Sequence, residues 1–378
     1  MNGRVTAGQI GRERLPRMLA LIEEGRERGQ HIGVQLYVSL RGEVIADLAI
    51  GESRPGVPMQ PGTLMLWLSS SKPVAAVAVA QLVERGALDY DAPVASYVPE
   101  FAEGGKEAVT LRHLLTHTGG FRTLPTGWPQ VPWEKTIARI CAMPLEPGWV
   151  PGEKAGYHPA TSWFMLGEII RRVDGRVYSQ YVREEIFEPL GMRDSWIGMP
   201  IERYREYGER IGILQNTERG GLEPHAYTTE AHVISCAPGA NGHGPLRELG
   251  WFYEMLLGGG ERNGVRILSP ESVSLLTTRQ RERMYDLTFM HTVDWGLGFI
   301  INSNRYGWQT VPYGFGRHAS EGTFGHGGMQ SSAGFADPER QLAVAIICNG
   351  TPGEARHTKR IRQLATALYE DLFEIEPA

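Results

Sequence analysis

The sequence predicts an α/β fold in which both ends of the chain build one antiparallel sheet flanked by N- and C-terminal helices, with an all-α domain inserted. Three observations predict this fold. The 378 residues exceed what one ordinary hydrophobic core supports. Strand patterns gather near both ends, and the elements expected between about residues 63 and 199 are almost all helical. We therefore expect a sheet domain of residues 1–62 and 245–378 and a mainly helical domain of residues 63–244.

The first elements are a helix and a hairpin. Apolar residues recur at helical spacing over residues 15–28, with charged residues between them, which indicates an amphipathic helix. Two β-rich runs at 33–39 and 43–50 are joined by Leu40-Arg-Gly42, a pattern typical of a β-hairpin. Several Pro and Gly residues between positions 55 and 62 then indicate a loop. Further helices are expected at 69–85, 111–117, 133–141, 161–173 and 178–186.

The C-terminal part returns to strands. Residues 208–244 are polar and Gly-rich, and we interpret them mainly as a connection. A helix at 246–257 follows, and Asp337-Pro-Glu-Arg340 predicts a tight turn between the last two strands. A helix at 358–373 closes the chain. The expected strands are 295–301, 323–330, 331–336 and 342–348.

Composition and charge narrow the function. Apolar residues make up 42% of the chain and the formal net charge is −5, which is typical of a folded globular protein. No cationic excess is present to hold a nucleic acid or an anionic membrane surface, so neither partner is expected. Any lysine placed for chemistry should stand out, because the chain has few of them. The lysines are Lys72, Lys106, Lys135, Lys154 and Lys359.

The cysteines and the apolar runs point to the cytoplasm by default. Cys141, Cys236 and Cys348 are odd in number and include no CxxC pair, so neither a disulfide scaffold nor a cysteine metal site is expected. Residues 1–14 lack the apolar stretch of a secretory signal, and the run at 73–83 is too short to span a bilayer. We expect a cytoplasmic protein without a cofactor.

A serine and a lysine offer the first candidate chemistry. The GxSxG, GxxxxGK[ST], GxGxxG and HExxH motifs are absent from the sequence. Within Ser69-Ser-Ser-Lys72, only Ser69 stands three residues before the lysine, which places both side chains on one helix face. A lysine whose pKa is lowered by burial can take the proton of a serine hydroxyl. The alternative is a helix cap beside a surface lysine.

Two further segments give the serine and lysine a context. Tyr157 lies just before a predicted helix, and Phe324-Gly-His326-Gly-Gly328 lies in a predicted strand far along the chain. With these three motifs, the sequence resembles the serine β-lactamase and penicillin-binding-protein superfamily, especially class C β-lactamases and family VIII carboxylesterases. In that family an SxxK motif, a tyrosine motif and a Lys-Thr-Gly strand line one cleft between two domains. All three occur here in the family's order, and the resemblance covers nearly the whole chain.

The resemblance implies a catalytic set. Ser69 would be the nucleophile that forms an acyl-enzyme, and Lys72 and Tyr157 would share the proton transfers. Which of the two is the general base stays open, because a coupled pair titrates as a unit. The oxyanion hole would be formed by the backbone N–H groups of Ser69 and Met329.

Departures from the family pattern bear on the substrate. Tyr157 is followed by His158 and Pro159, so the asparagine of the family's Tyr-x-Asn motif is missing. His326 stands where β-lactamases carry the lysine that receives a substrate carboxylate, and an imidazole attracts an anion less strongly. We expect His326, Gly327 and Gly328 to contact the substrate.

Aromatic residues between Phe121 and Trp149 suit an apolar substrate group, so Trp128 and Trp133 are also expected to bind substrate. The alternative is a surface loop that buries its own tryptophans. His113 and His117 stand four residues apart, a spacing that can hold a metal, but no carboxylate or cysteine accompanies them and no metal is expected.

The leading expectation is a serine hydrolase that cleaves carboxylic esters of small or medium acyl groups. The alternatives are an acyltransferase using the same acyl-enzyme, a β-lactamase or D-amino-acid peptidase, and a binding protein that has kept the fold without the reaction. The expected partner is a small ester or acyl substrate. The sequence leaves its identity and the oligomeric state open.

Overall fold

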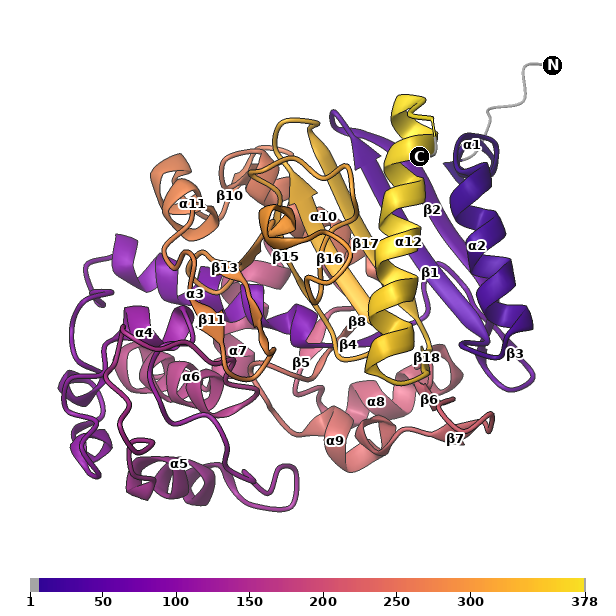
Figure 1. Cartoon of the computed structure of the whole chain (residues 1–378). Helices are drawn as coiled ribbons and strands as arrows, with labels where there is room; N and C mark the ends of the chain where they lie inside the picture. Colours follow the sequence, from indigo (N-terminus) through magenta and orange to yellow (C-terminus); the bar gives the residue numbers. More distant parts are fainter. Residues whose placement is uncertain (1–6, 377–378) are drawn as a thin grey trace.

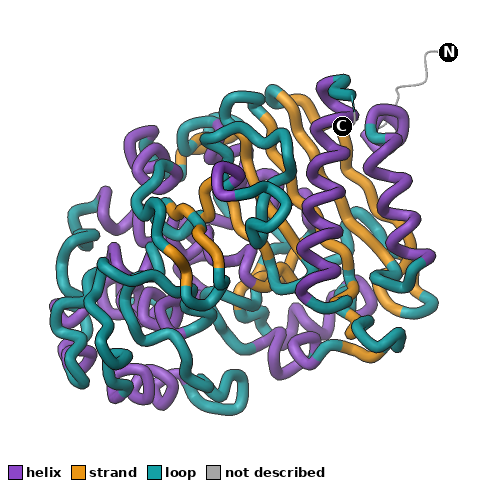
Figure 2. Tube along the Cα trace, viewed as in Figure 1, coloured by secondary structure: helices purple, strands orange, loops and turns teal. Residues whose placement is uncertain are grey.

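The computed structural model describes residues 7–376. Within them, an eight-stranded antiparallel sheet forms one side of the molecule (Figures 1 and 2). The antiparallel sheet and its flanking helices confirm the α/β fold predicted from the sequence. In spatial order the strands are β13 (Asp294–Trp295), β14 (Ile300–Ile301), β15 (Phe324–Gly327), β16 (Ser332–Asp337), β17 (Leu342–Cys348), β1 (Gly33–Leu40), β2 (Glu43–Arg54) and β3 (Val57–Pro58).

Helices cover both faces of this sheet. The N-terminal and C-terminal helices lie side by side on one face, and a helix from the middle of the chain covers the other (Figure 1). The helices are α1 (Ala7–Arg14), α2 (Pro16–Glu27), α3 (Lys72–Glu84), α4 (Leu111–Leu115), α5 (Trp133–Ala142), α6 (Thr161–Asp174), α7 (Tyr178–Val182), α8 (Ile201–Tyr207), α9 (Glu230–Ile234), α10 (Leu246–Leu257), α11 (Pro270–Thr277) and α12 (Glu354–Phe373).

Successive side chains of the central strands point to opposite faces of the sheet, and apolar residues on both faces explain why helices cover both. In β1, Leu36 packs in the cluster that includes α2 and α12, whereas its neighbour Tyr37 packs in the cluster that includes α10. Strand β17 alternates in the same way, and its Ile346 stands opposite Leu36 in the register. The pairing of β1 with β17 joins the two ends of the chain in one sheet.

The intervening chain packs mainly as helices around α3, whose residues from Lys72 to Leu82 are all buried. It also contains strands, which the sequence did not indicate, including the three-stranded sheet β4–β8–β5. The division at residues 62/63 and 244/245 stays a prediction. The strands outside the large sheet are β4 (Met65–Leu68), β5 (Trp196–Ile197), β6 (Gln215–Asn216), β7 (Glu223–Pro224), β8 (Gly242–Gly244), β9 (Glu261–Arg262), β10 (Val265–Arg266), β11 (Tyr285–Asp286), β12 (His291–Thr292) and β18 (Gly350–Thr351).

Two predicted elements differ from the structure near the site. The strand expected at 295–301 is two short strands, β13 and β14, because the chain reverses at Gly298, which has a φ of +84°. The helix expected at 69–85 begins as a 3-10 turn, Ser69–Ser71, before α3. No helix among the described residues is both long and apolar enough to cross a bilayer.

Candidate active site

Ser69 stands where strand β4 turns sharply into α3. Leu68 adopts a φ of 51°, a backbone conformation that is strained for any residue with a β-carbon. The two serines after Ser69 hold this turn. Ser71 Oγ donates to the Leu68 carbonyl at 2.7 Å, and Ser70 Oγ donates to the His326 carbonyl at 3.1 Å. Ser70 and Ser71 are buried, so Ser69 is the serine of the three that remains partly exposed, and it lines a cavity.

Lys72 is fully buried one helical turn after Ser69. Its Nζ donates to Ser69 Oγ at 3.0 Å and to the carbonyls of Pro159 at 2.9 Å and Gly239 at 2.7 Å. Burial holds the pKa of Lys72 well below that of a free lysine, because a charged amine is costly away from water. The buried residues of α3 thus enclose a lysine whose desolvation favours the neutral amine.

Tyr157 also contacts Ser69. It lies in the loop before α6, and its OH donates to Ser69 Oγ at 2.9 Å. The ring of Phe289 stacks on the Tyr157 ring, with centroids 4.7 Å apart. Burial raises the pKa of the Tyr157 phenol above that of free tyrosine. Burial therefore favours the neutral form of both Lys72 and Tyr157.

Strand β15 brings the third motif to the same place. His326 is 1% exposed and lines the cavity with Gly327. Its Nδ1 lies 2.8 Å from the Gly327 carbonyl, and burial together with the Lys72 charge lowers the pKa of His326 to about 3. Met329 also lines the cavity, but it lies in the turn after β15, which ends at Gly327 instead of reaching residue 330 as predicted.

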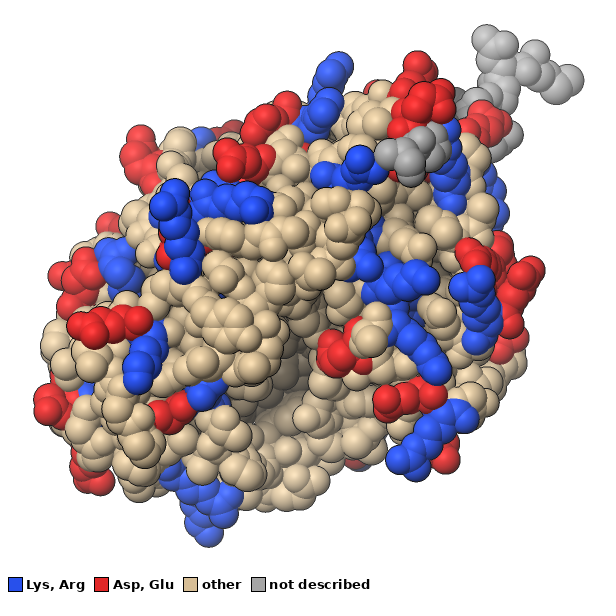
Figure 3. All heavy atoms as spheres, viewed as in Figure 1, with Lys and Arg blue, Asp and Glu red and all other residues tan. Residues whose placement is uncertain are grey.

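The cavity has a volume of about 750 Å³. Figure 3 shows the surface hollowed beside α12, next to Lys and Arg atoms. Strand β15, the segment 288–291, the segment 309–313 and helix α12 all contribute to it. The lining residues are Ser69, Tyr157, Pro159, Thr288, Phe289, Met290, His291, Gln309, Thr310, Pro312, Tyr313, His326, Gly327, Met329, Glu354, Ala355, Thr358, Lys359 and Arg362.

The predicted tryptophans are not part of this lining. Trp128 donates from Nε1 to the Ser235 carbonyl and packs against Tyr227, while Trp133 donates to Glu168 and packs against Phe164. Both side chains are half-buried and contact the helical part of the chain.

The two histidines spaced by four residues do not share a helix face. Helix α4 ends at Leu115, so His117 lies beyond it with a φ of 58°. His113 Nδ1 accepts the N–H of Thr110 in a capping box, whereas His117 is buried with its ring centroid 4.7 Å from that of Tyr157. The spacing of four residues therefore does not correspond to a shared helix face.

The sequence of the chain matches a known protein family over most of its length. The family model described as Beta-lactamase matches residues 18–369. The chain belongs to the beta-lactamase family. It is therefore an enzyme of a serine hydrolase family with the β-lactamase fold, and relatives in this family are named as esterases.

Three relatives of this beta-lactamase-family protein illustrate its range. It is 28% identical to the esterase/beta-lactamase LipL of Mycobacterium tuberculosis, covering 88% of this chain and 80% of that protein. A penicillin-binding protein homologue from Caulobacter crescentus superposes with a TM-score of 0.78 at 31% identity, covering 95% and 98% of the two chains. A family VIII carboxylesterase superposes with a TM-score of 0.78 at 27% identity, with the same coverage.

Sequence reasoning missed much of the wall around the motifs in this beta-lactamase-family chain. Phe289 and Tyr313 lie in irregular segments, where no periodic pattern marks a side chain as inward-facing. Lys359 and Arg362 stand three residues apart on α12, and that spacing indicates a shared face but not what the face meets. Only the packing of distant segments brings these residues to the cavity that Ser69 also lines.

Proposed function

We propose that the protein hydrolyses carboxylic esters of small or medium acyl groups through an acyl-enzyme on Ser69. One observation carries the proposal: Ser69 Oγ lies 3.0 Å from Lys72 Nζ and 2.9 Å from Tyr157 OH at the wall of an open cavity. A serine hydroxyl becomes a useful nucleophile when a neighbouring base takes its proton.

Burial lowers the pKa of Lys72 and raises the pKa of Tyr157, and this difference suggests how the protons move. Lys72, with its lowered pKa, is the group nearer to an unprotonated state at neutral pH, so we assign it as the base that removes the Ser69 proton. Ser69 Oγ attacks the ester carbonyl, and Tyr157 gives its proton to the leaving alcohol and regains one through Lys72. Water then attacks the acyl-enzyme carbonyl and gives a proton to Lys72, the bond between Ser69 Oγ and the acyl carbon breaks, and Ser69 Oγ takes that proton back as the acid is released.

The backbone N–H groups of Ser69 and Met329 are proposed to bind the developing oxyanion. Both residues line the cavity, and Met329 directly follows Gly328 in the turn after β15. Removing one such donor typically slows a reaction by about 10²–10³. Both N–H groups can bind one oxygen atom only if the turn that carries Met329 stays close to the end of β4, next to Ser69.

Two departures from the family pattern favour an ester over a β-lactam. Pro159 stands where the family asparagine would bind an amide, and its carbonyl is already used by Lys72. With its pKa near 3, His326 is neutral at neutral pH and offers no charge to a substrate carboxylate. The apolar side chains of Phe289, Met290 and Pro312 suit an uncharged acyl group instead.

The test is hydrolysis of p-nitrophenyl acetate and butyrate by the full chain and by Ser69→Ala. We expect kcat/KM to fall by about 10³ or more in the variant. Mass spectrometry of the quenched wild type should find the acyl group on the Ser69 peptide. The exposed Ser274→Ala serves as the matched control and should keep full activity. Intact hydrolysis by Ser69→Ala refutes the proposal.

The same experiment separates related reactions. Repeating it with added short alcohols measures how the acyl group divides between water and the alcohol, and a hydrolase releases mainly acid. Rapid turnover of nitrocefin with an acyl group on Ser69 would instead indicate a β-lactamase.

A further inference from the structure

A buried carboxylate lies directly behind the backbone of Tyr157. Asp286 is fully buried, and its Oδ1 accepts three backbone N–H bonds. They come from Tyr157 at 3.0 Å, from Thr288 at 2.9 Å and from Phe289 at 3.0 Å. One oxygen atom thus holds Tyr157 and two residues of the cavity wall together, although these lie about 130 positions apart in the chain.

The second carboxylate oxygen faces a buried arginine. Arg281 Nη2 lies 3.1 Å from Asp286 Oδ2, and both side chains are almost completely buried. The guanidinium also donates to the carbonyls of Thr116 at 2.9 Å and Val293 at 3.0 Å. These bonds balance the carboxylate charge, which would be costly to bury alone, and they fix the position of Asp286 from both sides.

The contacts between Tyr157 and the wall run in both directions. Thr288 Oγ1 donates to the Tyr157 carbonyl at 3.0 Å, so the wall segment takes both polar groups of the Tyr157 backbone. The Phe289 ring stacks on the Tyr157 ring at an interplanar angle of 22°. Leu287 N–H donates to the Ala155 carbonyl at 3.0 Å, which extends the attachment by two residues.

We propose that Asp286 is a positioning residue that holds the Tyr157 hydroxyl on Ser69 and ties it to the wall that receives the acyl group. This inference rests on the ester hydrolysis proposed above. Asp286 does not line the cavity, so it acts through Tyr157, Thr288 and Phe289. A displacement of about 1 Å in a reacting group can cost about 10²-fold in rate.

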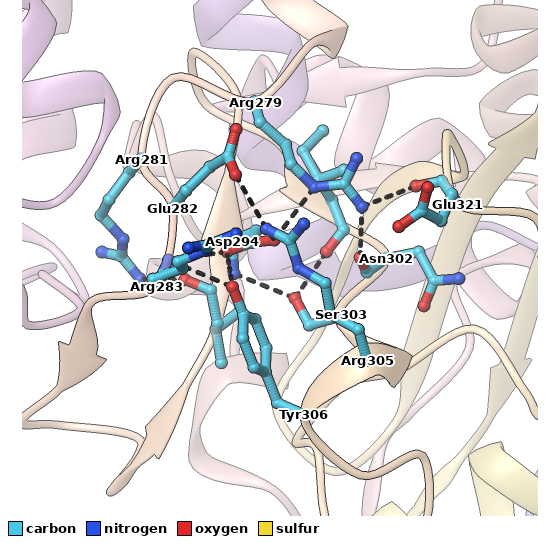
Figure 4. Close-up of polar contacts among 12 residues, drawn as sticks. Arg279, Arg281, Glu282, Arg283, Asp294, Asn302, Ser303, Arg305, Tyr306 and Glu321 are labelled. Carbon is cyan, nitrogen blue, oxygen red and sulfur yellow. Dashed lines mark hydrogen bonds and ion pairs between the residues drawn. The ribbon is translucent and has the colours of Figure 1, made fainter.

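Asp294 offers a matched control. It is another fully buried carboxylate in the same region, paired with Arg279 at 3.0 Å and Arg305 at 2.5 Å (Figure 4). It also accepts the Tyr306 hydroxyl at 2.9 Å and the Arg283 N–H at 3.2 Å. These contacts fasten the region to the edge of the sheet, and none of them reaches Tyr157.

The experiment compares Asp286→Asn with Asp294→Asn in the full chain. An asparagine keeps the size of the side chain but removes the charge that faces each arginine. We expect both variants to melt at a lower temperature. Below that temperature, Asp286→Asn should lower kcat for p-nitrophenyl butyrate by about 10- to 100-fold and shift the pH at which kcat/KM rises. Asp294→Asn should leave kcat within about twofold and the pH profile in place.

Thr288→Val provides a second variant that does not disturb the buried ion pair. It removes the hydroxyl bond to the Tyr157 carbonyl and the exposed bond that Arg122 Nη1 donates to the same hydroxyl. We expect a smaller fall in kcat, about 3- to 10-fold, with the same direction of pH shift. If Asp286→Asn does not fold, this variant decides the question: an unchanged pH profile then overturns the proposal.

The outcomes separate this inference from the function on which it rests. A Ser69→Ala variant that keeps full activity defeats the proposed function. If Ser69→Ala is inactive while Asp286→Asn and Asp294→Asn show the same kcat and the same pH profile, the proposed function stands and the positioning role of Asp286 is wrong.

Discussion

Lys72 shows how burial and hydrogen bonding compete at one residue. Its Nζ has three oxygen acceptors, which favour the charged ammonium, yet the residue is wholly enclosed by α3 and its surroundings. Desolvation is the larger effect, so its pKa falls well below that of a free lysine. Each unit of pKa lowering corresponds to about 1.4 kcal/mol in favour of the neutral amine.

The assignment of Lys72 as the base predicts a pH profile. The kcat/KM for a chromogenic ester should rise with pH as Lys72 loses its proton, and this rise should occur well below about pH 10.4, the ordinary lysine value. Tyr157→Phe removes the hydroxyl next to Ser69, so we expect kcat to fall by about 10²–10⁴ while the rise with pH persists.

The opposite result would reassign the roles. If Tyr157→Phe abolishes the rising limb and Lys72→Met retains it, Tyr157 is the base. The Lys72→Met variant leaves the carbonyls of Pro159 and Gly239 without their donor, so its melting temperature has to be measured alongside.

At the scale of elements, the turn after β15 and the end of β4 fit together with little space. A β-carbon added at Gly328 would lie 2.2 Å from Ser332 Oγ and 2.4 Å from the Trp67 carbonyl. The Ser332 hydroxyl itself donates to that carbonyl at 2.6 Å, which ties β16 to β4, the strand that directly precedes Ser69.

This close approach predicts the effect of a single methyl group. Gly328→Ala should push the turn that carries Met329 away from Ser69, and we expect kcat to fall by about 10²-fold or more. Gly322→Ala is the control, because its added carbon would meet only Pro338 at 3.5 Å, an ordinary contact. Equal activity of the two variants in the ester assay would show that this turn does not hold the oxyanion.

The elements also show what the sequence could and could not predict. The hairpin at 33–50, the helix at 246–257 and the closing helix follow from periodicity and appear as β1–β2, α10 and α12. The spacing of Ser69 and Lys72 suggested a nucleophile and a base, and the family resemblance added Tyr157; the structure brings the three side chains together. The role of each residue stays a prediction.

Long-range contacts were beyond the sequence. No local sequence pattern identifies Asp286, because its proposed role depends on accepting three backbone N–H bonds, one of them from a residue about 130 positions away. Trp128 and Trp133 are of a residue type that often lines binding sites, but their rings pack against Tyr227 and Phe164 in the helical part of the chain. A cavity wall is a property of tertiary packing, and one chain's composition does not determine which side of a loop faces it.

At the scale of the whole molecule, buried histidines make stability depend on pH. His31, between α2 and β1, is 1% exposed, and burial beside Arg360 lowers its pKa to about 3. As the pH falls below about 6.5, the unfolded chain takes up a proton at His31 while the folded chain does not. The free energy of unfolding should therefore decrease as the pH falls from about 6.5 toward 3.

The contribution of His31 can be measured directly. In His31→Gln, the slope of the unfolding free energy against pH, measured with urea between about pH 4.5 and 6, should be smaller by up to about 1.4 kcal/mol per pH unit. His158 and His326, whose pKa values are also lowered to about 3, remain in the variant and keep part of the slope. Identical slopes in the variant and the wild type would contradict this.

The pairing of β1 with β17 sets an order for synthesis on the ribosome. Residues 33–40 can pair with β2 early, but their hydrogen bonds to β17 need residues 342–348, so the growing chain carries one open strand edge through most of its translation. The cavity is later still, since α12 supplies part of its wall. A nascent chain that stops before α12 therefore has Ser69, Lys72 and Tyr157 but an incomplete cavity wall, so the proposed ester hydrolysis would have to await the C-terminal segment.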